Sequence, residues 1–444
     1  MKKNKWILPR HRVVRNLAYL VMYPYMRLKC GVKIEKFKEQ GDRQYLIVMN
    51  HQTVFDQFFV GCAVKGPVYY IATEDIFSMG WLSNLIRWAV NPIPIKKQTN
   101  DLKAVKTCIR VVKEGGTIAL APEGNRTYSG KLCYIKPSIV KLMRVLKLPL
   151  AIFRIEDGYG VQPRWCDDIR KGKMRAYFSR VVEPEEYAKL TDEEMLELIQ
   201  KELGVDEARV TGEFRHKNLA QYMERCLYVC PTCGLTTFES HGDTLTCKKC
   251  GLKVRYLPTK ELEGVPFRFM ADWYEYQNNF VRQLSVDTYL TKPAWREAAD
   301  LSEVLLYKKN VPLEEKVEIC LYSDRITVGE QVFPFAECGA VTVLGRNKLN
   351  IYFGDRVFQL KGDKRFNALK YVNFYHHYKN RTEGEENGEF LGLLCMGRHE
   401  SDHGAVVEFD LCQYAQAFSQ MAGGFADPHF GVGRRYAVGG GRRL

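Results

Sequence analysis

Short apolar runs alternate with helix-like stretches between residues 44 and 182, and this alternation limits the fold more than any other feature of the chain. Apolar residues recur with helical spacing over 101–114 and again over 138–147. Runs rich in branched and aromatic residues predict strands at 45–49, 68–72, 117–121, 148–153 and 174–178. Strands that alternate with helices along the sequence predict an α/β domain, in which helices pack against a sheet.

The N-terminus is basic and partly apolar. Residues 1–34 carry nine Lys or Arg and no Asp or Glu, and residues 16–26 are uncharged. A spanning helix needs about 20 apolar residues, so this stretch is too short to cross a membrane and suits a helix in the headgroup region. The alternative is an ordinary helix packed on its own domain. We expect residues 1–35 to form interfacial helices at the cytoplasmic face of a membrane, in a peripheral or monotopic protein.

Composition narrows the class of protein and its partners. A hydrophobic content of 46% and an aromatic content of 12% exclude a wholly disordered chain. The formal net charge of +14 favours anionic partners, such as phosphorylated substrates, an anionic membrane or nucleic acid. No small-residue cleavage site follows the N-terminal apolar stretch, so we expect the 14 Cys to lie in a reducing cytosol.

His51 and Asp56 form the first candidate for chemistry, because they directly follow the strand predicted at 45–49. A reaction in which a hydroxyl group attacks needs a base for the hydroxyl proton, and a neutral histidine is the usual base at pH 7. A carboxylate that accepts the Nδ1 proton orients the ring and stabilises the imidazolium. If a helix begins after His51, Asp56 lies about one turn further and can reach the ring. Taken alone, the pair is better explained as a cap or a surface pair.

A second group, Glu123, Gly124 and Arg126, follows the strand predicted at 117–121. The arginine guanidinium offers a fork of donors that suits phosphate. Glycine lets the backbone approach a ligand closely. Glu123 can hold the arginine or a substrate hydroxyl. The alternative is an ordinary strand-to-loop turn with a surface arginine.

Together, and in this order, these groups resemble the motifs of the lysophospholipid acyltransferase family. That family carries an NHxxxxD block, a short basic block, a PEG-x-R block and then an apolar strand containing proline. The matching segments here are 50–56, 91–97, 122–126 and 148–152. The resemblance covers roughly residues 10–185. The second block usually ends in Arg, where Lys96 and Lys97 stand here, and Asn125 replaces a usual Thr. These departures affect the identity of the acceptor more than the reaction.

The resemblance implies a fold and a reaction. The fold is a glycerophosphate-acyltransferase-like mixed sheet flanked by helices. The reaction moves a fatty acyl group from acyl-CoA or acyl-carrier protein to the free hydroxyl of 1-acyl-glycerol-3-phosphate, giving phosphatidic acid in phospholipid synthesis. His51 and Asp56 would be catalytic. The residues expected to bind substrate are Asn50, Lys96, Lys97, Glu123, Gly124 and Arg126. The alternatives are another lysolipid or glycolipid acceptor, or a non-catalytic zinc-ribbon scaffold. A scaffold predicts damaged motifs, and these are intact.

Two CxxC pairs, separated by 13 residues and each followed by Gly, predict a metal site. Four thiolates at this spacing form a closed, structural Zn²⁺ site of the zinc-ribbon type. Two disulfides or a redox pair are the alternatives, and a reducing compartment disfavours both. The basic residues of this segment can contact nucleic acid, but such ribbons more often brace protein contacts, so we do not expect a nucleic-acid partner. The predicted ligands are Cys230, Cys233, Cys247 and Cys250.

The domains follow from these features. Short alternating runs from 317 to 361 and a helix from 366 to about 377 predict a small β domain of pleckstrin-homology-like plan with a C-terminal helix. The expected partners are a membrane surface, a lysophospholipid acceptor and, if it is the donor, acyl-carrier protein. The predicted domains are interfacial helices at 1–35, an acyltransferase domain at 36–215, a zinc ribbon at 226–258, a helical linker at 265–312, the β domain at 313–382 and an irregular tail at 383–444.

Overall fold

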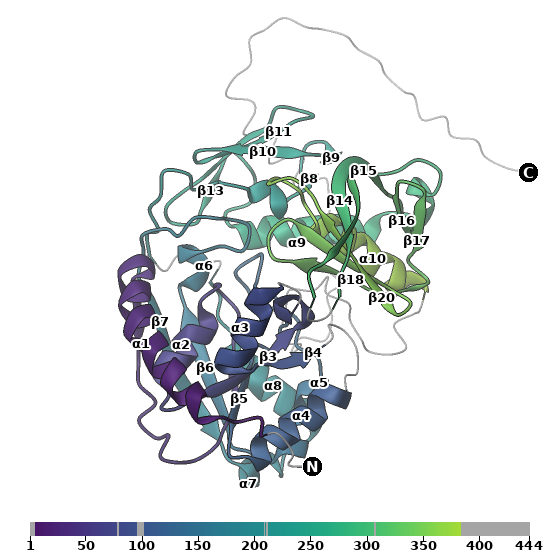
Figure 1. Cartoon of the computed structure of the whole chain (residues 1–444). Coiled ribbons are helices and arrows are strands. Elements are labelled where there is room, and N and C mark those ends of the chain that lie inside the picture. Colours follow the sequence, from purple (N-terminus) through teal and green to yellow (C-terminus); the bar gives the residue numbers. More distant parts are fainter. Residues whose placement is uncertain are drawn as a thin grey trace, which may run out of the picture. The chain divides into compact units, whose positions relative to one another are not determined.

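The computed structural model describes residues 5–77, 80–95, 102–207, 209, 212–305 and 308–382 (Figure 1). Lys96, Lys97 and the predicted irregular tail at 383–444 lie outside the described residues.

Seven strands form one mixed sheet in the order β1-β7-β6-β2-β5-β3-β4. All neighbouring strands in it are parallel except β6 and β7, which pair antiparallel. The central strand β2 carries four buried residues in a row, as expected of a strand covered on both faces. The strands are β1 (Val32–Ile34), β2 (Leu46–Met49), β3 (Val68–Thr73), β4 (Ile93–Ile95), β5 (Thr117–Leu120), β6 (Leu150–Glu156) and β7 (Met174–Val182).

Helices cover both faces of this sheet. Alternate side chains of β2 point to opposite faces, so Ile47 and Met49 pack with α1 and α2, whereas Leu46 and Val48 pack with α4, α5 and α8. The fold class predicted for this domain, a mixed α/β sheet flanked by helices, is confirmed. Its longer helices are α1 (Pro9–Cys30), α2 (Asp56–Ala63), α3 (Trp81–Val90), α4 (Leu102–Lys113), α5 (Ser138–Leu146) and α8 (Asp192–Leu203), and its short ones are α6 (Gly158–Val161) and α7 (Pro184–Tyr187).

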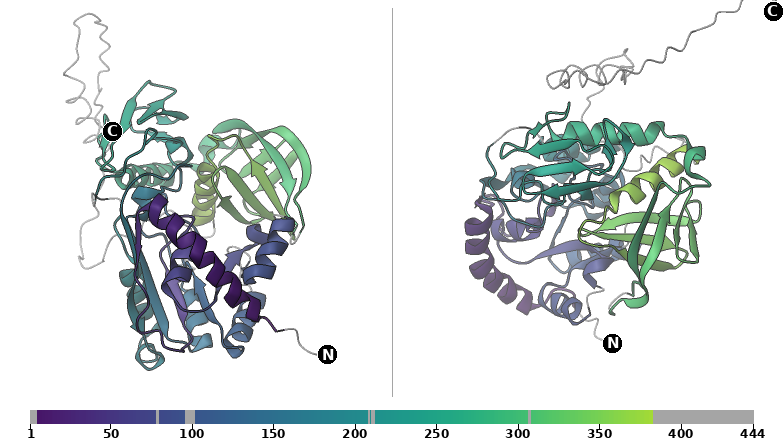
Figure 2. Two further views of the ribbon diagram at one scale, coloured as in Figure 1. Left: turned by 60° about the vertical axis from the view of Figure 1, so that its left-hand side comes forward. Right: turned by 90° about the horizontal axis from the view of Figure 1, so that it is seen from above.

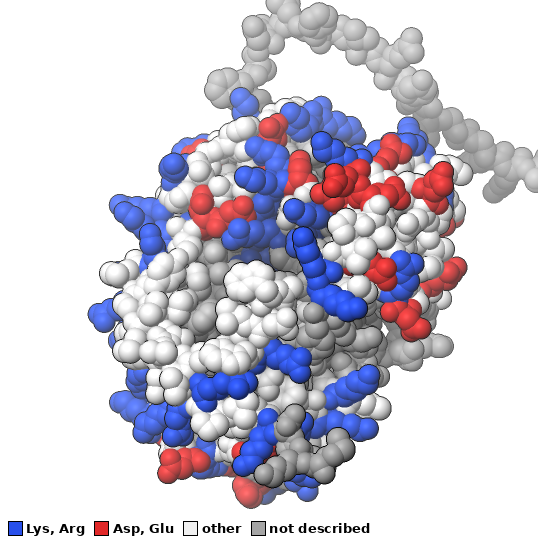
Figure 3. Space-filling model, viewed as in Figure 1, with Lys and Arg blue, Asp and Glu red and all other residues white. Residues whose placement is uncertain are grey.

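Helix α1 runs along the outside of the domain (Figure 2). Met26 and Cys30 are buried, but Leu17, Leu20 and Leu28 are 59%, 68% and 84% exposed. Lys and Arg side chains stand on the same side of the molecule, whereas the Asp and Glu side chains of the face in Figure 3 gather mainly over the β domain. Among the described residues, no helix combines the length and the apolar content that crossing a membrane requires.

The cysteine-rich segment folds into short hairpins and is followed by helix α9 (Met270–Gln283). Gln277 of this helix is fully buried and accepts hydrogen bonds from the amides of Tyr228 and Val229. The Trp273 indole donates to the Val229 carbonyl at 2.9 Å. Helix α9 therefore fixes the chain that enters the hairpins, which are built from β8 (Val229–Cys230), β9 (Gly234–Leu235), β10 (Phe238–His241), β11 (Thr244–Cys247), β12 (Lys253–Tyr256) and β13 (Leu262–Glu263).

A second seven-stranded sheet, entirely antiparallel, forms the β domain. Its order is β17-β16-β15-β14-β20-β19-β18, so two meanders meet where β14 pairs with β20, and the sheet curls into a nearly closed barrel. The small β domain with a C-terminal helix is confirmed. Its elements are β14 (Trp295–Glu303), β15 (Val311–Leu321), β16 (Arg325–Val328), β17 (Gln331–Pro334), β18 (Cys338–Leu344), β19 (Lys348–Phe353), β20 (Arg356–Lys361) and α10 (Leu369–Thr382).

The structure differs from the sequence prediction between residues 265 and 312, where helices were expected. Helix α9 occupies part of this segment, but residues 295–303 form strand β14 of the β domain. The segment contains Arg, Glu and Ala, which favour helices in isolation. Pairing on both edges, with β15 and with β20, overrides that preference.

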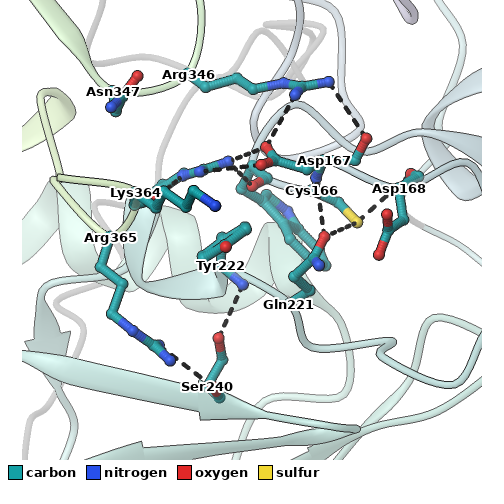
Figure 4. A network of polar contacts seen from close by, with 12 residues as sticks. Cys166, Asp167, Asp168, Gln221, Tyr222, Ser240, Arg346, Asn347, Lys364 and Arg365 are labelled. Carbon is teal, nitrogen blue, oxygen red and sulfur yellow. Dashed lines mark hydrogen bonds and ion pairs between the residues drawn. The ribbon is translucent and has the colours of Figure 1, made fainter.

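Asp167, in the loop between β6 and β7, joins the three parts of the described chain (Figure 4). It forms ion pairs with Arg225, just before the cysteine-rich segment, and with Arg346, in the turn after β18. Arg225 is 2% exposed and also donates to the carbonyls of Trp165 and Lys364. The β domain is therefore held to the α/β domain by buried and half-buried charges.

Candidate active site

A cavity of about 1520 Å³ opens beside His51 and the loop after β5. Its polar wall contains His51, Glu123, Arg126 and Arg164. Most of the remaining wall is apolar. It includes residues of α1, α2, β3, α3, α4 and α5, with a further part from β18 and α10 of the β domain. Concave, largely apolar sites with a few convergent polar groups at the carboxyl ends of strands are typical ligand sites of α/β proteins.

The structure brings His51 and Asp56 together. The His51 Nδ1 atom lies 2.8 Å from Asp56 Oδ2, across the turn that leads from β2 into α2. Asp56 is fully buried, and its carboxylate accepts hydrogen bonds from the amides of Gln52 and Thr53 and from the Thr53 hydroxyl, at 2.7, 2.9 and 2.7 Å. An ionised carboxylate cannot donate, so the proton of this contact lies on Nδ1 and the second ring nitrogen keeps its lone pair. The ring is thus oriented as a base.

Glu123 joins the loop after β5 to His51. One carboxylate oxygen accepts from the His51 amide at 2.7 Å, and the other accepts from the Cys133 amide at 2.8 Å. Burial raises the pKa of Glu123 to about 7, although both hydrogen bonds oppose the shift. The carboxylate therefore fixes the backbone of His51. Among the described residues, no hydrogen bond joins Glu123 to the guanidinium of Arg126.

Gly124 and Arg126 form the turn that follows. Gly124 has a φ of +66°, which favours glycine, and its amide donates to the Ala121 carbonyl at 3.0 Å. Arg126 is 8% exposed and lines the cavity, yet its Nη1 atom has no hydrogen-bond partner in the described chain. Burial, with a contribution from Arg164, lowers the pKa of Arg126 to about 10, so the side chain remains a cation at neutral pH.

Arg164 is a site residue that no sequence motif indicated. Its guanidinium donates to the Arg126 carbonyl at 2.8 Å and to Asn125 Oδ1 at 3.3 Å, and it lies 4.3 Å from the centre of the Tyr128 ring. Arg164 is 5% exposed and lines the same cavity. Two buried arginines at one place in the wall make this part of the cavity basic, a chemistry that suits an anionic ligand.

Asn50 lies outside the cavity wall, unlike Glu123, Gly124 and Arg126. It is fully buried and does not line the cavity. Its side-chain amide donates to the Ile155 carbonyl and accepts from the Ile155 amide, both at 2.8 Å. These contacts hold the end of β2 against β6, so Asn50 fixes the backbone that leads into His51.

The four predicted cysteines converge. All four Sγ atoms lie within 4.8 Å of one another, and the Cys230–Cys250 and Cys233–Cys247 sulfurs are 3.7 and 3.6 Å apart. A tetrahedral Zn²⁺ with Zn–S bonds of about 2.3 Å places its sulfurs about 3.8 Å apart, so the cluster fits one metal ion. The glycines after each pair have positive φ values of +74° and +76°, as tight turns at each pair require.

In a comparison with known protein families, residues 31–155 match the family model described as Acyltransferase. The 1-acyl-sn-glycerol-3-phosphate acyltransferase of Bacillus subtilis is 22% identical over 173 residues, which cover 38% of this chain and 83% of that protein. A solved structure, the 1-acyl-sn-glycerophosphate (LPA) acyltransferase PlsC from Thermotoga maritima, is 20% identical with a TM-score of 0.35, covering 43% of this chain and 74% of that chain. The segment that holds His51, Asp56, Glu123 and Arg126 therefore matches the acyltransferase family model, and the chain is distantly similar to a 1-acyl-sn-glycerol-3-phosphate acyltransferase.

Proposed function

We propose that this protein transfers a fatty acyl chain from acyl-CoA or acyl-carrier protein to the free hydroxyl of a lysophospholipid. The simplest such acceptor is 1-acyl-glycerol-3-phosphate, whose product is phosphatidic acid. The observation that carries the proposal is the oriented His51–Asp56 pair in the wall of a large apolar cavity, beside the buried arginines.

The chemistry needs no nucleophilic side chain. The unprotonated ring nitrogen of His51 takes the proton of the acceptor hydroxyl as its oxygen attacks the thioester carbonyl. The C–O bond forms, the tetrahedral intermediate collapses, and the C–S bond breaks. The departing thiolate takes the proton back from His51. Asp56 stabilises the imidazolium between these two steps.

The acceptor phosphate is expected to bind beside the base. A phosphate oxygen would give the buried Nη1 atom of Arg126 the partner that it lacks among the described residues. Arg164 positions Arg126 through its carbonyl and adds positive charge. Lys96 and Lys97, which follow β4, are proposed to complete the phosphate site on the strength of the family motif. Gly124 gives the acceptor close access to the backbone.

The four-cysteine cluster is proposed to hold a structural Zn²⁺. Four thiolates close the coordination sphere, so the ion supplies folding energy and no open position for a substrate.

The outer faces of α1 and α3 are proposed to bind a membrane surface at its cytoplasmic side. The two helices are neighbours, since Arg10 donates to the Trp88 carbonyl at 2.9 Å. Both expose large apolar side chains, including Leu20 at 68% and Trp81 at 76%. Exposed apolar groups beside basic ones suit an anionic lipid surface, where an acceptor with one acyl chain resides.

Replacing His51 with Ala is expected to lower kcat about 100- to 10,000-fold, because the general base is lost. Asp56→Asn should cause a loss of similar size, since an amide can stabilise the wrong ring tautomer. The assay incubates purified full-length protein with labelled acyl-CoA or acyl-carrier protein and a panel of lysolipids, followed by lipid mass analysis. His241→Ala, an exposed histidine of the cysteine-rich segment, is the matched control and should remain active. Undiminished acyl transfer by the His51→Ala variant would contradict the role of His51 as the base.

Arg126→Ala is expected to raise the KM for a phosphorylated acceptor about 10- to 100-fold, the usual worth of a charge-assisted hydrogen bond. The kcat at saturating acceptor should change much less. Steady-state kinetics over a range of acceptor concentrations measures both. Arg296→Ala, which removes a largely exposed arginine of the β domain, is the control. A fall in kcat with an unchanged KM would argue against phosphate binding by Arg126.

Protein purified under reducing conditions should contain about one zinc ion per chain, as expected of a closed four-cysteine site. Cys233→Ser should lose the ion and lower the thermal unfolding midpoint, as should a strong chelator. Cys320→Ser, outside the cluster, should keep the metal. Elemental analysis gives the stoichiometry, and finding no zinc in the reduced protein would refute the site.

The double variant Leu20→Asp and Leu28→Asp should reduce binding to anionic vesicles by at least about tenfold, because each apolar side chain contributes roughly 1.5–3 kcal/mol when removed from water. Sedimentation with phosphatidylglycerol-containing vesicles measures the bound fraction. Val332→Asp, at a half-exposed position of the β domain, is the control. Equal binding of the double variant and the parent would remove α1 from the proposed membrane surface.

A further inference from the structure

The β domain forms part of the wall of the active-site cavity. Residues Val341, Thr342 and Val343 of β18 line it, as do four residues of α10. These two elements pack against each other, and the Tyr375 hydroxyl of α10 donates to the Cys338 carbonyl of β18 at 3.0 Å. A domain appended after the acyltransferase-family segment therefore contributes side chains to the same cavity as His51.

Two of these side chains present buried polar atoms without partners. Thr342 is 3% exposed and His376 is 5% exposed. The Thr342 hydroxyl and both ring nitrogens of His376 have no hydrogen-bond partner among the described residues. A buried polar group left in this state costs about 1–3 kcal/mol, so such groups in a cavity wall indicate a ligand that supplies the missing bonds.

Basic residues lie near both β18 and α10. Strand β18 leads into the turn that carries Arg346, which is close enough to Arg126 to contribute to its lowered pKa, after burial and Arg164. Asp167 holds Arg346 through an ion pair at 3.2 Å. Lys136, another residue of the cavity wall, similarly adds to the lowered pKa of His376. Both elements therefore lie near basic residues, which is where the phosphate end of the acceptor would bind.

The chemistry of the two side chains limits what they can bind. Burial, with Lys136, lowers the pKa of His376 to about 3, so at pH 7 the ring is neutral with one donor and one acceptor. The Thr342 hydroxyl likewise both donates and accepts. A ligand hydroxyl, which both donates and accepts, satisfies both kinds of group.

We propose that Thr342 and His376 are specificity residues that hydrogen bond to hydroxyl groups of the acceptor's head group, beyond the phosphate held at Arg126. The preferred acceptor is then a lysophospholipid whose phosphate carries a neutral, hydroxylated substituent. A bare phosphate monoester would leave these atoms unpaired. The inference rests on the proposed function, because it concerns the acceptor of that reaction.

The test compares the affinities of two short-chain lysolipids for the full-length, metal-loaded His51→Ala protein, in which turnover is blocked. One is 1-acyl-glycerol-3-phosphate, and the other carries a glycerol on the same phosphate. Calorimetry should show about tenfold or tighter binding of the glycerol-bearing lipid, as expected for one or two buried hydrogen bonds. Thr342→Val and His376→Phe should each reduce this preference about threefold or more and leave the bare phosphate lipid within about twofold.

Two further variants guard against a merely structural effect. His376→Gln keeps a donor and an acceptor and should retain part of the preference. His377→Phe changes the next residue of α10, which contacts the Leu284 carbonyl at 2.9 Å and does not line the cavity, and it should keep the full preference. Thermal unfolding checks that each variant is folded.

Equal affinity of the parent for the two lipids would overturn the inference. The inference would also be overturned if Thr342→Val and His376→Phe lowered the affinity for both lipids equally, or changed only the affinity for the acyl donor. Acyl transfer by the wild-type protein would leave the proposed function standing in each case. A clear head-group preference without acyl transfer to any acceptor would instead support head-group binding by Thr342 and His376 and contradict the proposed function.

Discussion

A buried carboxylate needs nearby hydrogen-bond donors to replace the water that it has lost. The buried carboxylate of Asp56 therefore determines how the backbone around it must fold. Its donors are the amides of Gln52 and Thr53, the Thr53 hydroxyl and the ring of His51, so β2 must end and α2 must begin within this one turn. Asn50 anchors the turn to β6, and Glu123 anchors it to the loop after β5. Three neighbouring strands thus fix one imidazole, which is the pre-organisation that proton transfer requires.

The second constraint is the junction at Asp167. Arg225 and Arg346 both pair with this carboxylate, and Arg225 is almost wholly buried. Arg225 lies five residues before Cys230, the first cysteine of the cluster, and Gln277 of α9 fixes the chain between them. Arg365 adds a further ion pair to Glu224 beside the same segment. The ion pairs at Asp167 and Glu224 therefore connect the segment before the cysteine cluster to both the α/β domain and the β domain.

Features with local causes could be predicted from the sequence. Helical and strand periodicity located most of the α/β elements, and the spacing of the cysteines located their cluster. The segment 295–303 was misread as helical because its composition favours a helix and its strand pairing depends on partners far along the chain. Arg164, Thr342 and His376 carry no motif, and they reach the cavity only because distant segments fold together. Asn50 belonged to a recognisable motif, but only the structure separates a residue that positions the base from one that lines the cavity.

The proposed function depends on direct acyl transfer with His51 as the base, and a single-turnover experiment tests this step. Full-length protein is mixed with a labelled acyl thioester, first alone and then with a lysophospholipid, and the protein mass, the lipids and the free thiol are measured at each stage. Direct transfer predicts no acyl group on the protein before the acceptor is added, and equal amounts of acylated lipid and free thiol afterwards. A competent acyl-protein intermediate, or thiol release without acylated lipid, would contradict it.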